Sequence, residues 1–266
     1  MRDFMLLCPK CREELTREGN VLRCENHHSF DIARRGYSNL LLGNRKGTGD
    51  DKEMVRARTR FLSQGYYQPL CTALCEYLQT VSPACVVDAG CGEGFYTNQI
   101  RKALPSALVY GFDLSKYAVD EACKAHLDIT YAVCSVFHMP LGDECCDALV
   151  SVFAPFAIEE VSRVLKSGGY FIKAGPGPLH LMDLKKVLYE DVYENQIEEA
   201  NYPGFVHEDT RVIDYTIHVQ GQDMLQALFQ MTPYYWKTPR SGIEALKTIE
   251  ELDVRIQFHL DIYKKL

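Results

Sequence analysis

The sequence predicts an α/β fold in which a doubly wound parallel sheet follows a small metal-binding segment. Two observations support this prediction. Short apolar runs alternate with helical segments through residues 84–177, as in proteins built around a parallel sheet, and the first run leads into a glycine-rich loop. Three cysteines and two histidines stand close together within residues 8–28. The 266 residues allow one large domain or two unequal ones.

Composition limits the class of protein. Apolar residues make up 47% of the chain and charged residues 24%, which is typical of a soluble globular protein with a sizeable core. No run approaches the roughly 18 consecutive apolar residues of a membrane span, and the N-terminus lacks the apolar core of a secretory signal, so we expect a cytoplasmic protein. The eleven cysteines are therefore interpreted as thiols or metal ligands.

The first candidate site is a cluster of metal-ligand residues. Cys8 and Cys11 form a C-x-x-C pair, and Cys24 is followed by His27 and His28. Zinc prefers four tetrahedral thiolate and imidazole ligands, and two such pairs about a dozen residues apart can supply them. Spacing alone leaves both histidines open as the fourth ligand. A redox pair is the alternative, but it expects a surrounding βαβ unit, which is missing here. We predict one zinc ion that folds this segment.

The second candidate site is a glycine loop. An apolar run at residues 85–87 predicts a buried strand that ends at Asp88, and Gly90, Gly92 and Gly94 follow it. Glycines let the backbone turn sharply and approach a ligand closely. Residues 95–104 predict a helix before Pro105, and a second strand ends at Asp113. Its carboxylate can accept hydrogen bonds from both ribose hydroxyls of an adenosine at the carboxyl ends of the strands.

The loop pattern indicates which nucleotide is bound. Dinucleotide sites use G-x-G-x-x-G, which places a pyrophosphate at a helix N-terminus. Here the pattern is D-x-G-x-G-x-G, and an acid at Asp88 would repel phosphates. It suits a ligand with a cationic or amine-bearing tail. S-adenosylmethionine, with its adenosine, ammonium and sulfonium groups, is the predicted ligand.

The alternation of elements continues to the C-terminus. Further strands are expected at residues 129–134, 147–154, 170–175, 212–219 and 253–266, and further helices at 158–166, 179–196 and 221–231. We expect a turn at Gly168–Gly169 and a helix end at Pro233. The last two strands would complete a seven-stranded sheet.

Two motifs make a family resemblance explicit. D-x-x-x-S-x-F-x-P starts at Asp147, and E-x-x-R-V-L-K-x-G-G starts at Glu160. With the glycine loop, residues 84–177 resemble the Rossmann-like core of a class I S-adenosylmethionine-dependent methyltransferase. That family often has an acidic residue near the adenine in the loop after the third strand. Ser135 stands there in this sequence and can accept a hydrogen bond.

A narrower resemblance covers nearly the whole chain. The zinc-ligand segment, "HSFDIARRGYSNLL" at residues 28–41 and "FQMTPYYW" at 229–236 resemble the bacterial 23S ribosomal RNA guanine-N1 methyltransferases of the RrmA/TlrB type. The resemblance implies His28 as the fourth ligand of an N-terminal zinc ribbon, and a homodimer that frames the RNA. It also implies cofactor contacts from four residues: Tyr67, Cys91, Gly92 and His180. A helix-packing role for Tyr67 and a helix-capping role for His180 are the alternatives.

The resemblance also divides the chain into a zinc-binding domain at 1–35, a basic linker and helical segment at 36–80 and a methyltransferase domain at 81–266. Net charge is -7, yet residues 1–60 hold 13 basic and 9 acidic residues. Arg34, Arg35, Arg45 and Lys46 are candidates for phosphate contacts, with a solvated charged face as the alternative.

The predicted reaction transfers a methyl group to N1 of a guanine in a hairpin loop of 23S rRNA. Phe153 or Phe156, at the tip of the fourth strand, could stack on the base, although either could equally be core packing. No residue stands out as the general base, and Asp183 and Glu93 are possible. Two alternatives are a methyltransferase for a small molecule or protein, and a non-catalytic zinc protein that binds RNA.

Overall fold

The computed structural model describes residues 6–43, 49–197 and 201–266. A small antiparallel sheet in the N-terminal part has three strands in sequence order: β1 (Thr16–Glu18), β2 (Val21–Arg23) and β3 (Ser29–Asp31). The large sheet, in spatial order, consists of β10 (Phe205–Gln220), β11 (Glu251–Lys265), β9 (Leu165–Pro176), β8 (Cys146–Val152), β5 (Cys85–Ala89), β6 (Leu108–Asp113), β7 (Thr130–Val133) and β4 (Ser38–Asn39).

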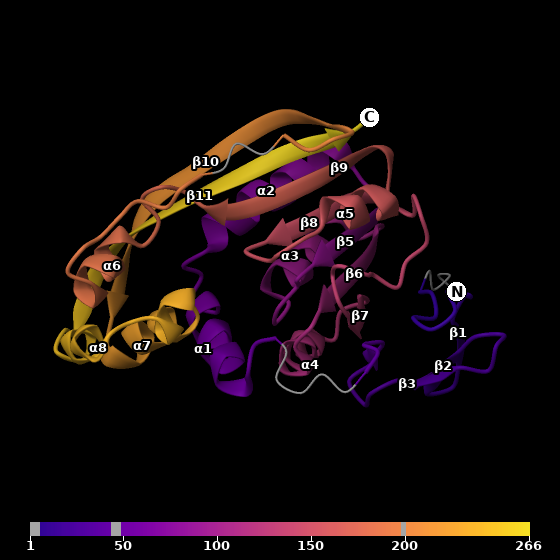
Figure 1. The fold of residues 1–266 in the computed structure, drawn as a ribbon, viewed down its shortest axis with the longest axis horizontal. Coiled ribbons are helices and arrows are strands. Elements are labelled where there is room, and N and C mark those ends of the chain that lie inside the picture. Colours follow the sequence, from indigo (N-terminus) through magenta and orange to yellow (C-terminus); the bar gives the residue numbers. More distant parts are fainter. Residues whose placement is uncertain (1–5, 44–48, 198–200) are drawn as a thin grey trace.

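Helices connect these strands and cover the sheet (Figure 1). They are α1 (Lys52–Leu62), α2 (Gln68–Val81), α3 (Phe95–Ala103), α4 (Lys116–Ala122), α5 (Ile158–Val164), α6 (Met182–Leu188), α7 (Gln222–Gln230) and α8 (Arg240–Lys247), with short 3-10 turns at Cys123–Ala125 and Pro233–Trp236. None of the helices in these ranges combines the length and apolar character of a membrane span.

The order of the large sheet reverses at its centre. From β5 the chain proceeds outward through β6 and β7, and then returns to β8 on the other side of β5 and continues to β9. All six strands from β4 to β9 are parallel, while β11 is antiparallel to both β9 and β10. This is the predicted Rossmann-like class I methyltransferase arrangement. In such sheets the ligand lies at the carboxyl ends of the strands where the order reverses, which here is between β5 and β8.

The sheet has eight strands where seven were predicted. The additional strand is β4, whose backbone pairs with β7 through Ser38 and Asn39. Ser38 and the neighbouring Leu40 are buried, so this piece of the predicted linker is part of the sheet edge. A two-residue strand has too little periodicity to be recognised in a sequence.

The predicted helix over residues 179–196 is wrong in extent, because α6 ends at Leu188. The chain beyond it folds back instead of continuing the helix. Lys185 donates through Nζ to Tyr193 O at 3.1 Å and to Asn195 Oδ1 at 2.7 Å, and the Asn195 amide donates to Gly177 O at 2.8 Å. These long-range side-chain bonds compete with helix formation, and local propensity does not report them. The helix α8 was not predicted.

The N-terminal segment packs on one face of the large sheet. Leu6, Leu15 and Leu22 are buried in the same apolar cluster as Tyr110 and Phe112 of β6. Apolar contact with the sheet thus supplies part of the core that a segment of this size lacks.

Backbone acceptors after β7 also attach this segment to the sheet. Arg12 donates to Leu141 O at 2.7 Å and to Met139 O at 3.2 Å, and Leu7 N donates to Pro140 O at 2.8 Å. Arg163 of α5 donates to the same two carbonyl groups as Arg12. The segment is therefore fixed against the loop that follows the third parallel strand.

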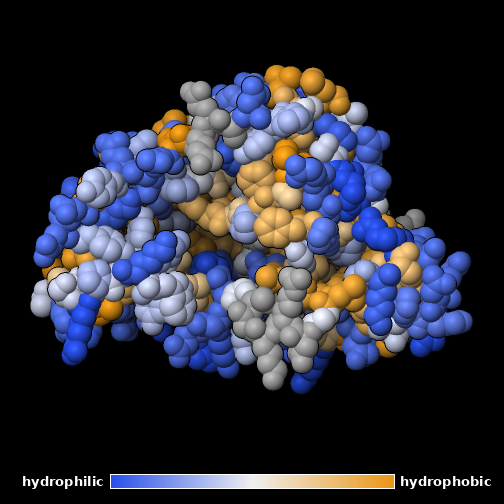
Figure 2. Space-filling model, in the orientation of Figure 1, coloured by the Kyte–Doolittle hydropathy of each residue, from blue (hydrophilic) through white to orange (hydrophobic). Residues whose placement is uncertain are grey.

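The zinc-ligand segment and the helices α6, α7 and α8 lie at opposite ends of the molecule, with α1 and the carboxyl ends of the strands between them (Figure 1). Figure 2 shows that this face is hollowed between the helical end and the sheet, and that hydrophobic residues line the hollow. Gly90 of the predicted glycine loop lies against Ala154, directly after β8.

Candidate active site

Four ligand atoms in the N-terminal segment form one cluster. The thiols of Cys8, Cys11 and Cys24 and the imidazole of His28 offer atoms that all lie within 4.8 Å of one another. Cys11 Sγ is 3.7 Å from Cys24 Sγ, and His28 Nδ1 is 3.4 Å from Cys8 Sγ and 3.6 Å from Cys24 Sγ. Ligands of a tetrahedral zinc ion lie about 3.5 to 3.8 Å apart, given bond lengths of about 2.0 to 2.3 Å. The donor set fits zinc, and no position is left for a substrate.

The backbone around these ligands explains the choice between the two histidines. His27 N donates to Cys24 O at 2.9 Å, and Cys24 N donates to His28 O at 3.1 Å, which closes a tight turn. His27 occupies the turn with φ of 59° and is exposed, while His28 is directed at the three thiols.

The glycine loop leaves β5 at the point where the strand order reverses. Gly90 has φ of 87°, and a Cβ there would lie 2.2 Å from Ala154 Cβ; Gly94 has φ of 82°, and a Cβ there would lie 2.8 Å from Ala122 Cβ. Both positions therefore require glycine for conformation and for space. By contrast, a Cβ at Gly92 would have only Arg58 Nη1 nearby, at 3.6 Å. The middle of the loop is the part that a ligand can approach.

Asp113, at the end of β6, is held by the loop. Gly92 N donates to its Oδ2 at 3.0 Å, and Ser115 N donates to its Oδ1 at 2.7 Å. Burial raises the pKa of Asp113, although these two backbone hydrogen bonds oppose the effect. The carboxyl group is thus oriented before any ligand arrives, and each oxygen keeps a second lone pair for a hydroxyl donor.

Asp88 is buried where β5 meets the loop and accepts a hydrogen bond from Thr97 Oγ1 at 2.5 Å. Burial raises its pKa to about 7, against the opposing effect of the Thr97 bond. Aspartate in an unfolded chain titrates near about 3.9. Between about pH 4 and pH 7 the folded protein therefore retains a proton that the unfolded chain has lost.

The free energy of unfolding should consequently decrease as pH rises through this window, and Asp88→Asn should flatten the decrease. Chemical denaturation at about pH 5 and about pH 7.5 measures it. Buried Glu93, whose pKa burial also raises to about 7, acts in the same direction, so part of the slope should remain. Asp223→Asn, at an exposed position on α7, is the control. An unchanged slope in Asp88→Asn would contradict the assignment.

Aromatic side chains gather beside the loop. Tyr67 is buried and contacts the rings of Phe153, His180 and Phe258 at centroid distances of 6.4, 6.1 and 4.8 Å. His180 Nδ1 accepts a hydrogen bond from Gln257 N at 3.3 Å, so its Nε2 carries the hydrogen. Burial lowers the pKa of His180 to about 3, and the imidazole is neutral near pH 7. The ring of His180 does not cap α6.

Phe153 follows β8 and has φ of 54°, a conformation that a bulky residue rarely adopts. Its side chain is 45% exposed and stacks on His180 at 5.9 Å. Phe156 instead packs against Phe171 and Tyr202 in the apolar core, at 4.9 and 5.7 Å. Of the two predicted base-stacking residues, Phe153 is therefore the more exposed.

The other predicted residues are more scattered. Cys91 is buried in the loop, and Ser135, after β7, accepts from Phe137 N at 3.3 Å. Arg34 is exposed, whereas Arg35 forms an ion pair with Asp120 at 2.9 Å. Arg45 and Lys46 lie outside the described residues.

Neither possible general base gains support from its surroundings. Asp183 accepts hydrogen bonds from Arg255 N and Lys186 Nζ, both at 3.0 Å. Burial would raise the pKa of Asp183, but these bonds lower it overall. Glu93 faces Arg58, with Oε2 and Nη1 3.8 Å apart. This contact of Arg58 joins α1 to the glycine loop, and no local sequence pattern predicts it.

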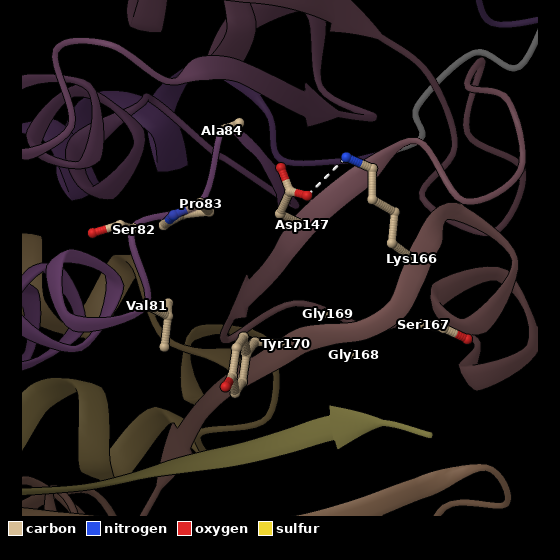
Figure 3. A pocket seen from close by; sticks show the side chains of 10 residues that line it. All are labelled: Val81, Ser82, Pro83, Ala84, Asp147, Lys166, Ser167, Gly168, Gly169 and Tyr170. Carbon is tan, nitrogen blue, oxygen red and sulfur yellow. Dashed lines mark hydrogen bonds and ion pairs between the residues drawn. The ribbon is translucent and has the colours of Figure 1, made fainter.

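A separate cavity lies at the opposite, amino-terminal edge of the sheet (Figure 3). It measures about 310 Å³, and Asp147 and Lys166 form an ion pair of 2.7 Å at its wall. Residues 82–84, which precede β5, line it. It is thus at the other end of β5 from the glycine loop and has no part in the site described above.

Comparison with known proteins matches both parts of the chain. The family model described as "RlmA, N-terminal", a zinc ribbon, matches residues 6–48, and one described as "Methyltransferase domain" matches residues 87–173. The 23S rRNA (guanine(748)-N(1))-methyltransferase of Streptomyces fradiae is 33% identical over 240 residues, which cover 87% of this chain and 85% of that protein. This chain belongs to the 23S rRNA (guanine-N1)-methyltransferase family.

Two more relatives carry names of the same family. YxjB of Bacillus subtilis (strain 168) is 30% identical over 278 residues, which cover 99% of this chain and 98% of YxjB. A protein of Micromonospora griseorubida is 36% identical over 200 residues, covering 67% of this chain and 68% of its own. As a member of this family the chain is an S-adenosylmethionine-dependent enzyme with one zinc ion, for which the Cys8, Cys11, Cys24 and His28 cluster provides the ligands.

Proposed function

We propose that this chain transfers the methyl group of S-adenosylmethionine to N1 of a guanine in a hairpin loop of 23S rRNA. The observation that carries the proposal is the similarity to YxjB, which extends over 99% of this chain and includes both the zinc segment and the methyltransferase core. A small-molecule or protein methyltransferase is not favoured. A protein without cofactor binding is not favoured either, because the glycine loop keeps the space and the carboxyl groups, Asp88 and Asp113, that a cofactor would need.

The proposed cofactor site has the space and the carboxyl groups that the donor would need. The glycine loop leaves space over Gly92. Asp88 and Asp113 lie near the carboxyl ends of the adjacent strands β5 and β6. Asp88 pairs with Gly111 of β6, and Asp113 pairs with Val133 of β7. Asp113 would accept hydrogen bonds from the ribose hydroxyls, and Asp88 would favour the cationic tail. When bound, S-adenosylmethionine supplies a methyl group on a sulfonium, which is already a good leaving group. The enzyme therefore contributes mainly position and orientation.

The acceptor platform would be Phe153. The adjacent Ala154 packs so closely on Gly90 that a Cβ at Gly90 would overlap it, so the tip of β8 lies directly on the cofactor loop. A base on the exposed ring of Phe153 would therefore lie next to the methyl donor. Its neighbours Tyr67, His180 and Phe258 hold the ring in a conformation that costs about 1–3 kcal/mol of backbone strain. Strain of this size suggests a functional position.

Guanine N1 imposes a condition on the RNA. The nitrogen carries a proton and lies on the Watson–Crick edge, which a duplex hides. The target must therefore be unpaired or flipped out to reach Phe153. A hairpin loop meets this condition.

Phe153→Ala should lower kcat/KM for the RNA about 5- to 100-fold, because stacking on an aromatic ring contributes about 1–3 kcal/mol per base. Affinity for S-adenosylmethionine should stay within about twofold of the wild type. Phe137→Ala is a matched control, since Phe137 is 44% exposed and Phe153 is 45% exposed. Equal losses in the two variants would show that stacking at Phe153 is not used.

The function is tested by methyl transfer to 23S rRNA transcripts, followed by digestion and identification of the nucleoside by mass spectrometry. The expected product is 1-methylguanosine from a loop position. A transcript in which the loop guanines are replaced by adenine is the control and should stay unmethylated. A methylated base other than guanine, or no transfer by protein that binds the donor, would overturn the proposal.

The front of the chain would contribute phosphate contacts through exposed Arg34, with Arg45 and Lys46 as further candidates. The affinity for the RNA, and with it kcat/KM for methylation, should then fall steeply as the salt concentration rises. The homodimer and the three domains at 1–35, 36–80 and 81–266 also stay predictions. Light scattering coupled to size-exclusion chromatography tests the dimer.

A further inference from the structure

Arg58 places a guanidinium group over the cofactor loop. It lies on α1, with 25% of its side chain exposed, and its Nη1 would be 3.6 Å from a Cβ at Gly92. Gly92 is the loop position that has space for a ligand, and its N–H already orients Asp113. A positive charge therefore faces the same space as the carboxyl group proposed to hold the ribose.

Three carboxyl groups surround this guanidinium. Nη1 forms an ion pair with Asp50 and lies 3.8 Å from Glu93 Oε2, and Asp113 adds a longer-range attraction. Burial alone would lower the pKa of Arg58, but the charges of Glu93 and Asp50 outweigh it and raise the pKa. Arg58 is therefore charged near neutral pH.

The two nearest acids, Glu93 and Asp50, differ in how far they are exposed and so in whether a ligand could replace them as partners of Arg58. Glu93 is 8% exposed, and within the described ranges its buried Oε2 accepts no hydrogen bond. Asp50 is more accessible, with 32% of its side chain exposed, and it stands on the segment before α1. Its backbone oxygen is held separately by Ser115 Oγ at 2.6 Å, so the side chain can move without detaching the segment.

Arg58 also has unused donor capacity. A guanidinium offers five N–H groups in a planar fork and binds carboxylates through two of them at once. Among the described residues, its side chain donates one hydrogen bond, from Nη1 to Asp50. The remaining N–H groups can donate to a second carboxylate, or a ligand carboxylate can replace that of Asp50.

We propose that Arg58 binds the α-carboxylate of S-adenosylmethionine, that the carboxylate of Asp50 competes for the same guanidinium, and that Glu93 holds the guanidinium in place. The ligand carries one carboxylate, on its amino acid end, and Arg58 is the cation that the described residues direct at Gly92. This inference rests on the use of S-adenosylmethionine and not on the identity of the methyl acceptor.

The test compares two ligands that differ by the carboxylate alone. S-adenosylmethionine and its decarboxylated analogue share the adenosine, sulfonium and ammonium groups. Calorimetry with the full zinc-loaded chain should show that Arg58→Ala lowers the affinity for S-adenosylmethionine about 10- to 100-fold. This is the loss expected for one charge-assisted hydrogen bond. The same variant should change binding of the decarboxylated analogue by less than about threefold, and Arg58→Lys should restore part of the loss.

Two further variants make the test sharper. Arg60→Ala, at an exposed position on the same helix, should bind both ligands as the wild type does. Asp50→Asn should bind S-adenosylmethionine a few-fold more tightly, because the competing carboxylate is gone. Thermal unfolding of each variant shows whether it is folded.

The proposal is overturned if Arg58→Ala lowers the affinity for both ligands equally or for neither. It is also overturned if Asp50→Asn lowers the affinity for S-adenosylmethionine but not for the decarboxylated analogue. No RNA takes part in these measurements. A failure of rRNA methylation would therefore leave this result intact, and a failure here would leave the proposed acceptor untouched.

Discussion

Asp113→Ala is expected to lower the affinity for S-adenosylmethionine by about 100-fold or more, and methyl transfer with it. The change removes the carboxylate proposed to bind the ribose, and it also leaves the N–H groups of Gly92 and Ser115 without their acceptor. The loop would then lose the orientation that the ligand needs. Isothermal titration calorimetry measures the affinity directly.

Asp113→Asn separates the two effects. An amide oxygen can still accept from one backbone N–H, so the loop should keep more of its order, while the charge is lost. We expect an intermediate affinity. Asp223→Asn, on the surface of α7, is the control for the loss of one negative charge. Binding by Asp113→Ala at the wild-type level would remove the basis for the cofactor site described here.

His28→Ala is expected to release the zinc ion and unfold the three-stranded sheet of residues 16–31. Structural zinc sites contribute about 10–16 kcal/mol to the folding of small domains, and this segment buries few apolar side chains of its own. Metal analysis of the purified variant should find less than one zinc per chain, and limited proteolysis should cut within the first 40 or so residues. Chelation of zinc from the wild type should have the same effect.

His27→Ala is the matched control, because the two histidines are adjacent and only His28 joins the ligand cluster. The control should retain its zinc. Zinc loss from His27→Ala together with retention by His28→Ala would reverse the assignment. The large sheet should stay folded in His28→Ala, in His27→Ala and in the chelated wild type, since residues of β5, β6, β8 and β9 contribute to its core.

Much of the site could be predicted because its parts are local in the chain. Four zinc ligands lie within 21 positions, between Cys8 and His28, and their spacing follows the geometry of two tight turns. The loop from Asp88 to Gly94 joins a strand to a helix, so its glycines and acids appear as one motif. Asp113 was recognisable because parallel strands end at the same edge of a sheet.

Contacts between distant segments could not be predicted in the same way. Arg58 meets Glu93 across 35 positions, and Arg12 reaches Met139 and Leu141 across more than 120. No periodicity connects such pairs. The pairing of β4 with β7 is of the same kind.

By itself the sequence determined the class of fold, the identity of the zinc ligands up to two adjacent histidines, and the loop and acids that we propose as the cofactor site. Only the tertiary structure decided which of Phe153 and Phe156 is exposed, because exposure depends on what packs against each. Phe156 packs against Phe171 and Tyr202 in the core, whereas Phe153 stays 45% exposed. It also decided which cation stands over the loop. Both outcomes depend on the packing of α1 and of the strand tips in space, which local sequence patterns do not record.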